Sequence, residues 1–261
     1  MAIIAAGAGM RGYKKNAQWG LQMARYGLAS HVFVCRDEEY IVVLDLRQDR
    51  YFTLEAAKTA ALSVEVPGWP AAAPAGAVAT SVVDEVAISL QRRGWLLEES
   101  GHPKDATPVR NPAAESELVE SGGFAQTHIR IGPGMLFSFV AASLFAKLAL
   151  RFCRFDRVVN RVARRGARRR AAATQPLDLE RARQLVAAFG RMRVFLFSSR
   201  DECLHDSLAV VEFLARYGLY PNWVFGVRAR PFEAHCWVQH AGIVFNDTVE
   251  QVGAYVPIML A

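Results

Sequence analysis

The sequence predicts an α+β protein built of two domains: a small one with three strands plus helices, and a larger one with both helices and strands. Its 261 residues, 52% of them hydrophobic, are enough to give each of two domains a core. Short β-branched runs lie near the start of the chain, whereas helical patterns precede a cluster of strands near its end. The stretch between the two parts is proline-rich and has no hydrophobic period, which is typical of a linker. We therefore expect a flexible extension over residues 1–22, a first domain over 23–100, a linker over 101–123 and a second domain over 124–261.

The first domain begins with three predicted strands and continues with helices. The strands are Val32–Cys35, Tyr40–Asp45 and Arg50–Leu54, separated by polar turns. Then come helical regions over Glu55–Val64 and Val78–Arg93, a Pro/Ala/Gly loop over Pro67–Gly76 between them, and a short strand at Trp95–Leu97. This order indicates a small winged-helix-like domain; a generic α+β module and a DNA-binding winged helix are the alternatives. Because Arg92 and Arg93 are the only basic pair in the second helical region, DNA binding is disfavoured.

The cysteines indicate neither a zinc site nor a disulfide framework, and we expect no metal and no cofactor. The four of them are scattered without a C-x-x-C pair, at Cys35, Cys153, Cys203 and Cys236. Residues 1–22 carry their basic side chains after a short apolar run, the reverse of a secretory signal, and Met23 is an alternative start. We expect a cytoplasmic protein whose thiols stay reduced, which suits a thiolate nucleophile.

Two contrasting helical stretches open the second domain. Gly134–Leu150 is strongly apolar, but it is at the lower length limit of a membrane span and contains Lys147. A buried helix is therefore favoured, and an interfacial helix stays open. Arg151–Arg170 holds nine arginines and one acid, Asp156, whereas the whole chain has a net charge of +6. A solvated helix face is the first interpretation of this segment; docking to an acidic partner, binding of a precursor and, last, RNA binding are the alternatives.

The remaining elements lead into a catalytic pattern. A short amphipathic helix over Asp178–Phe189 and an apolar run over Val194–Phe197 precede a helix that starts near Cys203. Gly218 and Pro221 end that helix. Three predicted strands follow, at Asn222–Val227, Ala234–Gln239 and Ile243–Asn246.

Cys203, His235 and Asp247 are the candidate catalytic residues. A cysteine in the first turn of a helix feels the positive end of the helix dipole, which lowers its pKa toward the thiolate. A hairpin centred near Ala241 would place His235 opposite Asp247 on one face of the sheet, although an off-centre turn would shift this register. Taken singly, a buried thiol and a packed imidazole are the plainer interpretations, but the combination favours nucleophile, base and orienting acid. The neighbours His205 and Cys236 are expected to point away and are assigned no catalytic role.

Two blocks of the sequence resemble a known family. SSRDECLHDSLA (198–209) and GVRARPFEAHCWVQHAGIVFND (226–247) are similar to the transglutaminase-like cysteine peptidase of lasso-peptide biosynthesis, the B protein, and the resemblance covers roughly Arg181–Ala261. It implies a papain/transglutaminase-like fold with Cys203 as nucleophile, His235 as base and Asp247 as orienting acid. The family removes the leader from a ribosomal precursor peptide. A partner synthetase, similar to asparagine synthetase, then closes the macrolactam ring.

The first domain resembles the precursor-peptide recognition element found in peptide-maturation enzymes. In that family the leader adds as a strand beside the third strand and packs against the last helix, which is β-augmentation. The resemblance points to a leader-binding surface that contains Arg50, Tyr51, Phe52, Leu54, Val83, Ala87 and Leu90.

The function expected from the sequence is therefore cleavage of a leader from its core peptide. The backbone N–H of Cys203 is one candidate oxyanion donor, and Ser199, Arg200 and Trp223 are candidates for the second. Two alternatives stay open: acyl transfer by the same triad, and a non-catalytic peptide-binding adaptor. The expected partners are the precursor peptide and the synthetase, with neither a nucleic acid nor a membrane.

Overall fold

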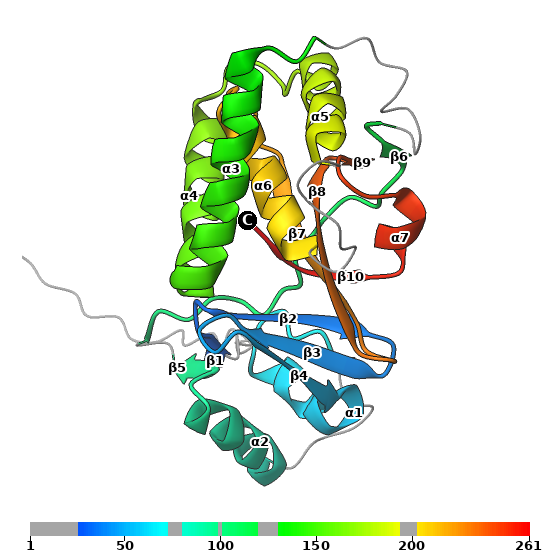
Figure 1. Ribbon diagram of the computed structural model, residues 1–261. Coiled ribbons are helices and arrows are strands. Elements are labelled where there is room, and N and C mark those ends of the chain that lie inside the picture. Colours follow the sequence, from blue (N-terminus) through cyan, green and yellow to red (C-terminus); the bar gives the residue numbers. More distant parts are fainter. Residues whose placement is uncertain (1–25, 73–79, 99–100, 120–129, 194–202) are drawn as a thin grey trace, which may run out of the picture.

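The computed structural model describes residues 26–72, 80–98, 101–119, 130–193 and 203–261. The expected extension over 1–22, the apolar run Val194–Phe197 and the loop residues Ser199 and Arg200 lie outside the described residues. The fold is mixed α+β, with a three-stranded sheet in the first part of the chain and a five-stranded sheet with helices in the second (Figure 1).

The first part contains the predicted strands and helices with small shifts in their bounds. Its elements are β1 (Tyr26–Leu28), β2 (Val32–Asp37), β3 (Tyr40–Asp45), β4 (Arg50–Glu55), α1 (Ala56–Thr59), the 3₁₀ helix η1 (Ala60–Val64), α2 (Thr80–Arg92) and β5 (Leu96–Glu98). The sheet order is β2-β3-β4, with both pairs antiparallel. A separate pair, β1 with β5, includes a strand that was not expected from the sequence. The winged-helix assignment stays a prediction.

The three-stranded sheet is covered on both faces. Successive side chains of a strand point to opposite faces, so Ile41 and Val43 of β3 join the core under α2, whereas Val42 and Leu44 join the core of the second part. All four are at most 1% exposed. Burial on both sides explains why β3 is an uninterrupted apolar run instead of an alternating one. The two parts of the chain therefore share a hydrophobic interface.

The segment predicted as a linker is packed against the second part. Its strand β6 (Ser116–Glu117) pairs in parallel with β9 (Ile243–Val244), and Leu118 is buried. The amide of Gln239 donates a hydrogen bond of 2.7 Å to the carbonyl of Pro112 and accepts one of 3.1 Å from Asn111. This stretch of chain thus adds an edge strand to the larger sheet.

The second part consists of helices followed by a sheet. Its elements are α3 (Pro133–Phe152), α4 (Phe155–Ala172), α5 (Leu179–Arg193), α6 (Cys203–Ala215), β7 (Asn222–Arg228), β8 (Glu233–His240), β9, α7 (Val249–Gly253) and β10 (Val256–Leu260). The sheet order is β10-β7-β8-β9-β6. Neither α7 nor β10 was expected from the sequence.

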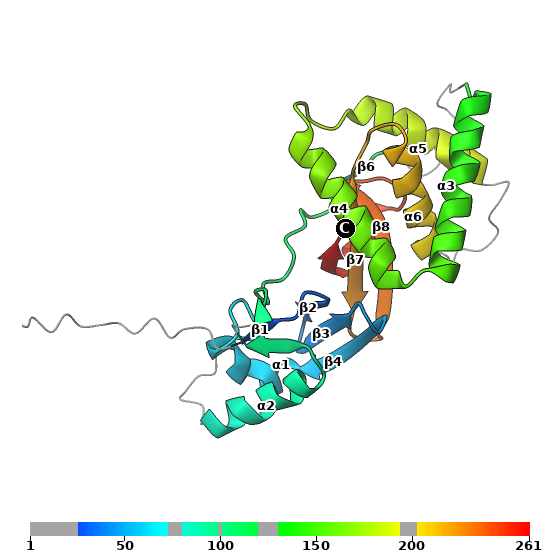
Figure 2. The same cartoon turned by 90° about the vertical axis from the view of Figure 1, so that its left-hand side faces the viewer.

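Helix α6 lies between the sheet and α3, so the second part is layered (Figures 1 and 2). Because it is covered from both sides, α6 is buried around nearly its whole circumference. Helix α3 differs from expectation: the sequence predicted a buried helix, but only one face is buried. That face carries Phe139, Ala142, Ala146 and Ala149, and its small side chains allow α3 to approach α6 closely.

Candidate active site

Cys203 is the first residue of α6, as the sequence predicted. Its side chain is half-buried and packs against the main hydrophobic cluster of the second part. The N-terminus of a helix carries a partial positive charge, which favours the thiolate over the thiol. The position therefore suits a nucleophile that is held firmly but stays partly open to solvent.

His235 and Asp247 are hydrogen-bonded to each other. Nε2 of His235 lies 2.5 Å from Oδ2 of Asp247, and the two side chains are 15% and 19% exposed. The other carboxylate oxygen, Oδ1, accepts a hydrogen bond of 2.8 Å from the backbone N–H of Thr248. The imidazole also lies close enough to the sulfur of Cys203 for each group to shift the pKa of the other. Cys203, His235 and Asp247 therefore form the chain of contacts that a nucleophile, a base and an orienting acid require.

The register that led to this pair was wrong by one residue. In the structure Gln239 pairs with Val244 and His240 with Ile243, so an unbroken hairpin would set His235 opposite Thr248. Strand β9 ends at Val244, however, and the chain then bends. Asp247 reaches His235 from this bend and not from a paired strand position.

Asn246, which was not among the residues expected at the site, fixes the bend. Its Oδ1 accepts a hydrogen bond of 2.8 Å from the N–H of Val238, and its Nδ2 donates one of 3.0 Å to Oγ of Ser207. Ser207 is fully buried and donates in turn to the carbonyl of Cys236 at 2.9 Å. Side chains from α6 and the bend thus tie the three catalytic positions together. In the sequence, the roles of these two residues were indicated only by their positions: Asn246 precedes Asp247, and Ser207 lies one helical turn after Cys203.

Cys236 is closer to the nucleophile than strand alternation suggested. It faces away from His235 and is buried, but its thiol hydrogen-bonds with Cys203. That bond is the largest contribution to the pKa of Cys203 and lowers it; burial raises it, and the bond with His235 lowers it further, to about 4. The same hydrogen bond and burial raise the pKa of Cys236, which therefore keeps its proton.

The pKa of His235 moves in the opposite direction to that of Cys203. Burial lowers it, but hydrogen bonds with Asp247 and with Cys203 outweigh burial and raise it to about 9. Between the two values Cys203 is a thiolate and His235 an imidazolium. This ion pair is the reactive state of a cysteine nucleophile paired with a histidine.

These shifts predict how the reactivity of Cys203 depends on pH. Alkylation of Cys203 by iodoacetamide should stay fast as the pH falls, until the thiolate is protonated near pH 4. Replacing Cys236 with alanine removes the largest lowering contribution, so the acidic limb of the profile should move to higher pH. The measurement is the rate of labelling at Cys203, followed by mass spectrometry of its peptide, with the exposed Cys153 as internal reference. Identical acidic limbs in the two proteins would contradict the role given to Cys236.

Two aromatic rings fix the plane of the imidazole. The ring of Trp237 is stacked on His235 at 6.1 Å, and the ring of Tyr255 lies 5.1 Å away. Gly226 stands directly opposite His235 on β7. A Cβ at Gly226 would come within 2.7 Å of Trp237 and 2.9 Å of Tyr255, so only glycine allows these rings to close around the site.

The first part of the chain contributes Tyr51 to the surroundings of the site. Tyr51 lies on the face of β4 that is turned toward the second part, and its ring is 5.6 Å from the ring of Phe232. Burial raises the pKa of Tyr51 well above its usual range, so its hydroxyl stays protonated. The face of β4 that carries Tyr51 therefore packs against the second part of the chain.

Most of the predicted leader-binding residues lie on the other face of β4 and on α2. Phe52 packs its ring 4.8 Å from Trp95, and Leu54 packs against the same cluster as the buried Ala87 and Leu90. Arg50 is exposed at the start of β4, and Val83 lies in α2 with its side chain outside the described part. Among the described residues, no strand pairs with the outer edge of β4.

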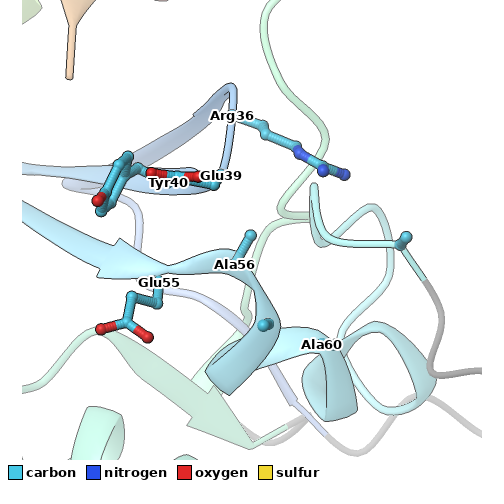
Figure 3. A pocket seen from close by; sticks show the side chains of 8 residues that line it. Arg36, Glu39, Tyr40, Glu55, Ala56 and Ala60 are labelled. Atoms are coloured by element: carbon cyan, nitrogen blue, oxygen red, sulfur yellow. The ribbon is translucent and has the colours of Figure 1, made fainter. Parts of the chain in front are cut away.

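A cavity of about 630 Å³ opens where β4 runs into α1 (Figure 3). It is lined by Arg36, Glu39, Tyr40, Glu55, Ala56, Ala57, Ala60 and Ala72. None of these residues belongs to the triad, so the cavity is a feature of the first part of the chain.

Of the candidate oxyanion donors, the structure describes Cys203 and Trp223. The N–H of Cys203 stays a candidate donor, and Ser199 and Arg200 lie outside the described residues. Trp223 is fully buried, packs on Phe225 at 4.6 Å and lies close enough to Cys236 to lower the pKa of that thiol, so it stays a candidate. Within the described ranges, no group of three His, Cys, Asp or Glu side chains is arranged to hold a metal ion.

A comparison with protein families finds a match in the second part of the chain. Residues 145–260 match the family model described as Transglutaminase-like superfamily. The matched region begins inside α3, ends in β10 and contains all three candidate catalytic residues. No curated protein and no solved structure matches the chain. A transglutaminase-like domain is compatible with cysteine peptidase or acyl-transfer chemistry, since both proceed through a thioester.

Proposed function

We propose that this protein is the leader peptidase of a lasso-peptide pathway. It binds the leader of a ribosomal precursor peptide with its first part and cuts the leader from the core with Cys203, His235 and Asp247. The observation that carries this proposal is the contact chain from Cys203 through His235 to Asp247, inside a transglutaminase-like domain. The resemblance of residues 198–209 and 226–247 to the lasso-peptide B protein supplies the substrate class.

The proposed reaction is hydrolysis of one amide bond in two steps. The Cys203 thiolate attacks the scissile carbonyl, and His235, as imidazolium, protonates the leaving amine of the core peptide. The leader is then held as a thioester on Cys203. His235, now neutral, takes a proton from water, which attacks the thioester and releases the leader as a carboxylic acid. Asp247 holds the imidazole so that its other nitrogen faces the sulfur throughout.

The outer edge of β4, which pairs with no strand in the part of the chain that the structure describes, supports the proposed mode of leader binding. An unpaired strand edge offers a row of N–H and C=O groups to an extended peptide. The apolar cluster around Phe52, Leu54 and Leu90 lies on the α2 side of the same strand, where alternate side chains of the peptide would pack. Tyr51, on the opposite face of β4, packs against the hydrophobic cluster of the second part on which Cys203 also packs, which places the two residues on the same side of the small sheet.

The partners in this proposal are the precursor peptide and a macrolactam synthetase that is similar to asparagine synthetase. No nucleic acid and no cofactor takes part. A cytoplasmic location suits both the ribosomal substrate and a reduced thiol.

Two other functions use the same features: acyl transfer from the thioester to an amine, and a non-catalytic adaptor that only binds the peptide.

The experiment that tests the function is incubation of the purified protein with a synthetic precursor, with and without an added primary amine. The expected products are leader acid and free core peptide, whose mass spectra together account for the precursor plus one water. A leader coupled to the amine would instead assign acyl transfer. An intact precursor that is nevertheless bound would assign the adaptor.

Pairing with β4 predicts an alternating effect of backbone methylation in the leader. Along a paired peptide, every second N–H points to β4 and the others point away. N-methylation of the N–H groups that point to β4 should therefore weaken leader binding by at least about tenfold, since several hydrogen bonds of about 1 kcal/mol are lost. A leader methylated at the other N–H groups should bind nearly as well as the parent peptide. Fluorescence anisotropy with labelled leaders measures both series, and each series is the control of the other. Equal affinities would move the leader site away from β4.

A further inference from the structure

Helix α3 presents a continuous apolar face to solvent. Large side chains recur along it at helical spacing and are exposed by 45% or more: Leu136, Phe137, Val140, Leu144, Leu148 and Phe152. Phe137 and Phe152 are 71% and 76% exposed. By length and composition α3 would be able to cross a membrane. The opposite face packs on α6, however, so the helix is held in the fold and only its outer face is available.

A row of arginines on α4 borders this apolar face. Residues 154, 157, 161, 164 and 168 are exposed arginines at helical spacing. The guanidinium of Arg161 lies 4.6 Å from the ring centre of Phe145 on α3, so the row and the apolar helix are in direct contact. Figures 1 and 2 show α3 and α4 side by side on one flank of the second part. We call the exposed face of α3 together with this arginine row the α3–α4 surface.

Three arginines of this row, with two of their neighbours on α4, line a surface cavity. It has a volume of about 470 Å³ and is lined entirely by arginines: Arg161, Arg164, Arg165, Arg168 and Arg169. Of these, Arg165 is held by two hydrogen bonds of 2.8 and 2.9 Å to Glu212. None of the five lining residues is acidic, and a group of guanidinium ions is a typical site for phosphate.

The charge of the α3–α4 surface decides between its possible occupants. Residues 151–170 contain nine arginines and a single acid, Asp156, which already pairs with Arg154. A second copy of the chain would bring an equally basic row against the first, which repulsion disfavours. An anionic bilayer offers both complements at once: acyl chains for the apolar side chains and phosphates for the guanidinium groups.

We propose that the α3–α4 surface binds a membrane surface rich in anionic phospholipid. The outer face of α3 lies at the boundary between headgroups and acyl chains, and the arginines of α4 bind the lipid phosphates. The chain lies on the membrane and does not span it, because the inner face of α3 stays packed on α6. Helix α7, which follows Asp247, lies on the other side of the sheet from α3 (Figure 1), so the region around Asp247 faces away from the bilayer.

The test is flotation of the full-length protein with vesicles of phosphatidylcholine alone and of phosphatidylcholine mixed with phosphatidylglycerol. We expect recruitment to the mixed vesicles only, and release by added salt because exposed charges are screened. Replacing Arg161, Arg164 and Arg168 with glutamine should weaken binding by roughly 100-fold, since each basic residue near an anionic surface contributes about fivefold. The double variant Phe137→Ser, Leu144→Ser should reduce recruitment at every salt concentration.

Matched controls separate this surface from general effects of charge and polarity. Arg181→Gln with Arg183→Gln removes exposed arginines from α5, and Ile88→Ser removes an exposed apolar side chain from α2. Both control proteins should float like the parent. Failure of the parent to bind the mixed vesicles, or equal binding by the α3–α4 variants, would overturn the proposal. A third result would also overturn the proposal: the parent forms a dimer in sedimentation velocity, Phe137→Ser dissociates that dimer, and the vesicles recruit no protein. Helix α3 would then be an interface between two copies of the chain. These outcomes are independent of peptidase activity.

Discussion

Replacing Cys203 with alanine is expected to lower the rate of leader cleavage by about 10⁴-fold or more, as deletion of the nucleophile does in comparable triads. The reason is that Cys203 alone combines the start of α6 with hydrogen bonds to both His235 and Cys236. Cys236 does not replace it, because burial and its bond to Cys203 keep it protonated. The comparison is single-turnover cleavage of the precursor by the parent and by Cys203→Ala.

The control for this experiment is Cys153→Ala, which removes an exposed thiol from the end of α3 and should cleave at the parental rate. Leader affinity should be equal in all three proteins, because β4 and α2 are unchanged. Near-parental cleavage by a folded Cys203→Ala protein would contradict the proposed nucleophile.

Replacing Asp247 with asparagine should lower cleavage by up to about 10⁴-fold, through a different physical cause. Asparagine keeps the shape of the side chain but removes the charge that holds the imidazolium. Hydrogen bonding with Asp247 is the main influence that raises the pKa of His235, so that pKa should fall in the variant. The alkaline limb of the pH–rate profile should therefore move to lower pH. The position of the alkaline limb can be measured even when the absolute rate is low.

The neighbouring variant Asn246→Ala is informative as a contrast. Asn246 holds the bend without touching the imidazole, and alanine removes its bond to Ser207 without adding a charge. We expect a smaller loss of rate with an unchanged alkaline limb. If Asp247→Asn left the alkaline limb in place, Asp247 would be a structural residue and not the partner that stabilises the imidazolium.

The sequence predicted most of the elements that position the site. Cys203 at a helix start could be read directly, because the apolar spacing after it and Gly218 mark the helix clearly. The predicted hairpin placed His235 beside Asp247, and the two residues are in contact, but the predicted register was wrong. The turn is one residue off the assumed centre, and the contact depends on a bend that Asn246 stabilises through α6. Such a contact between distant segments leaves no local pattern.

Other features could not be predicted because they depend on tertiary packing. Strand alternation placed Cys236 on the face away from His235, which is correct, but only the packing of α6 on β8 brings it to Cys203. Helix α3 is apolar on both faces, and the sequence alone does not tell which face is covered. Strand β10 is short and contains a proline, Pro257, which argues against a strand in a single sequence, yet it pairs with β7 at the sheet edge.

The central claim is that Cys203 attacks the bond at the end of a bound leader. The most direct measurement uses a synthetic leader peptide that ends in a chloromethyl ketone at the cleavage position, followed by mass spectrometry of the labelled protein. The account predicts one label per chain, located on Cys203, which excess free leader prevents and which forms much more slowly in Asp247→Asn. A label on Cys153 or Cys236 instead of Cys203, or labelling of Cys203 that free leader does not slow, would contradict it.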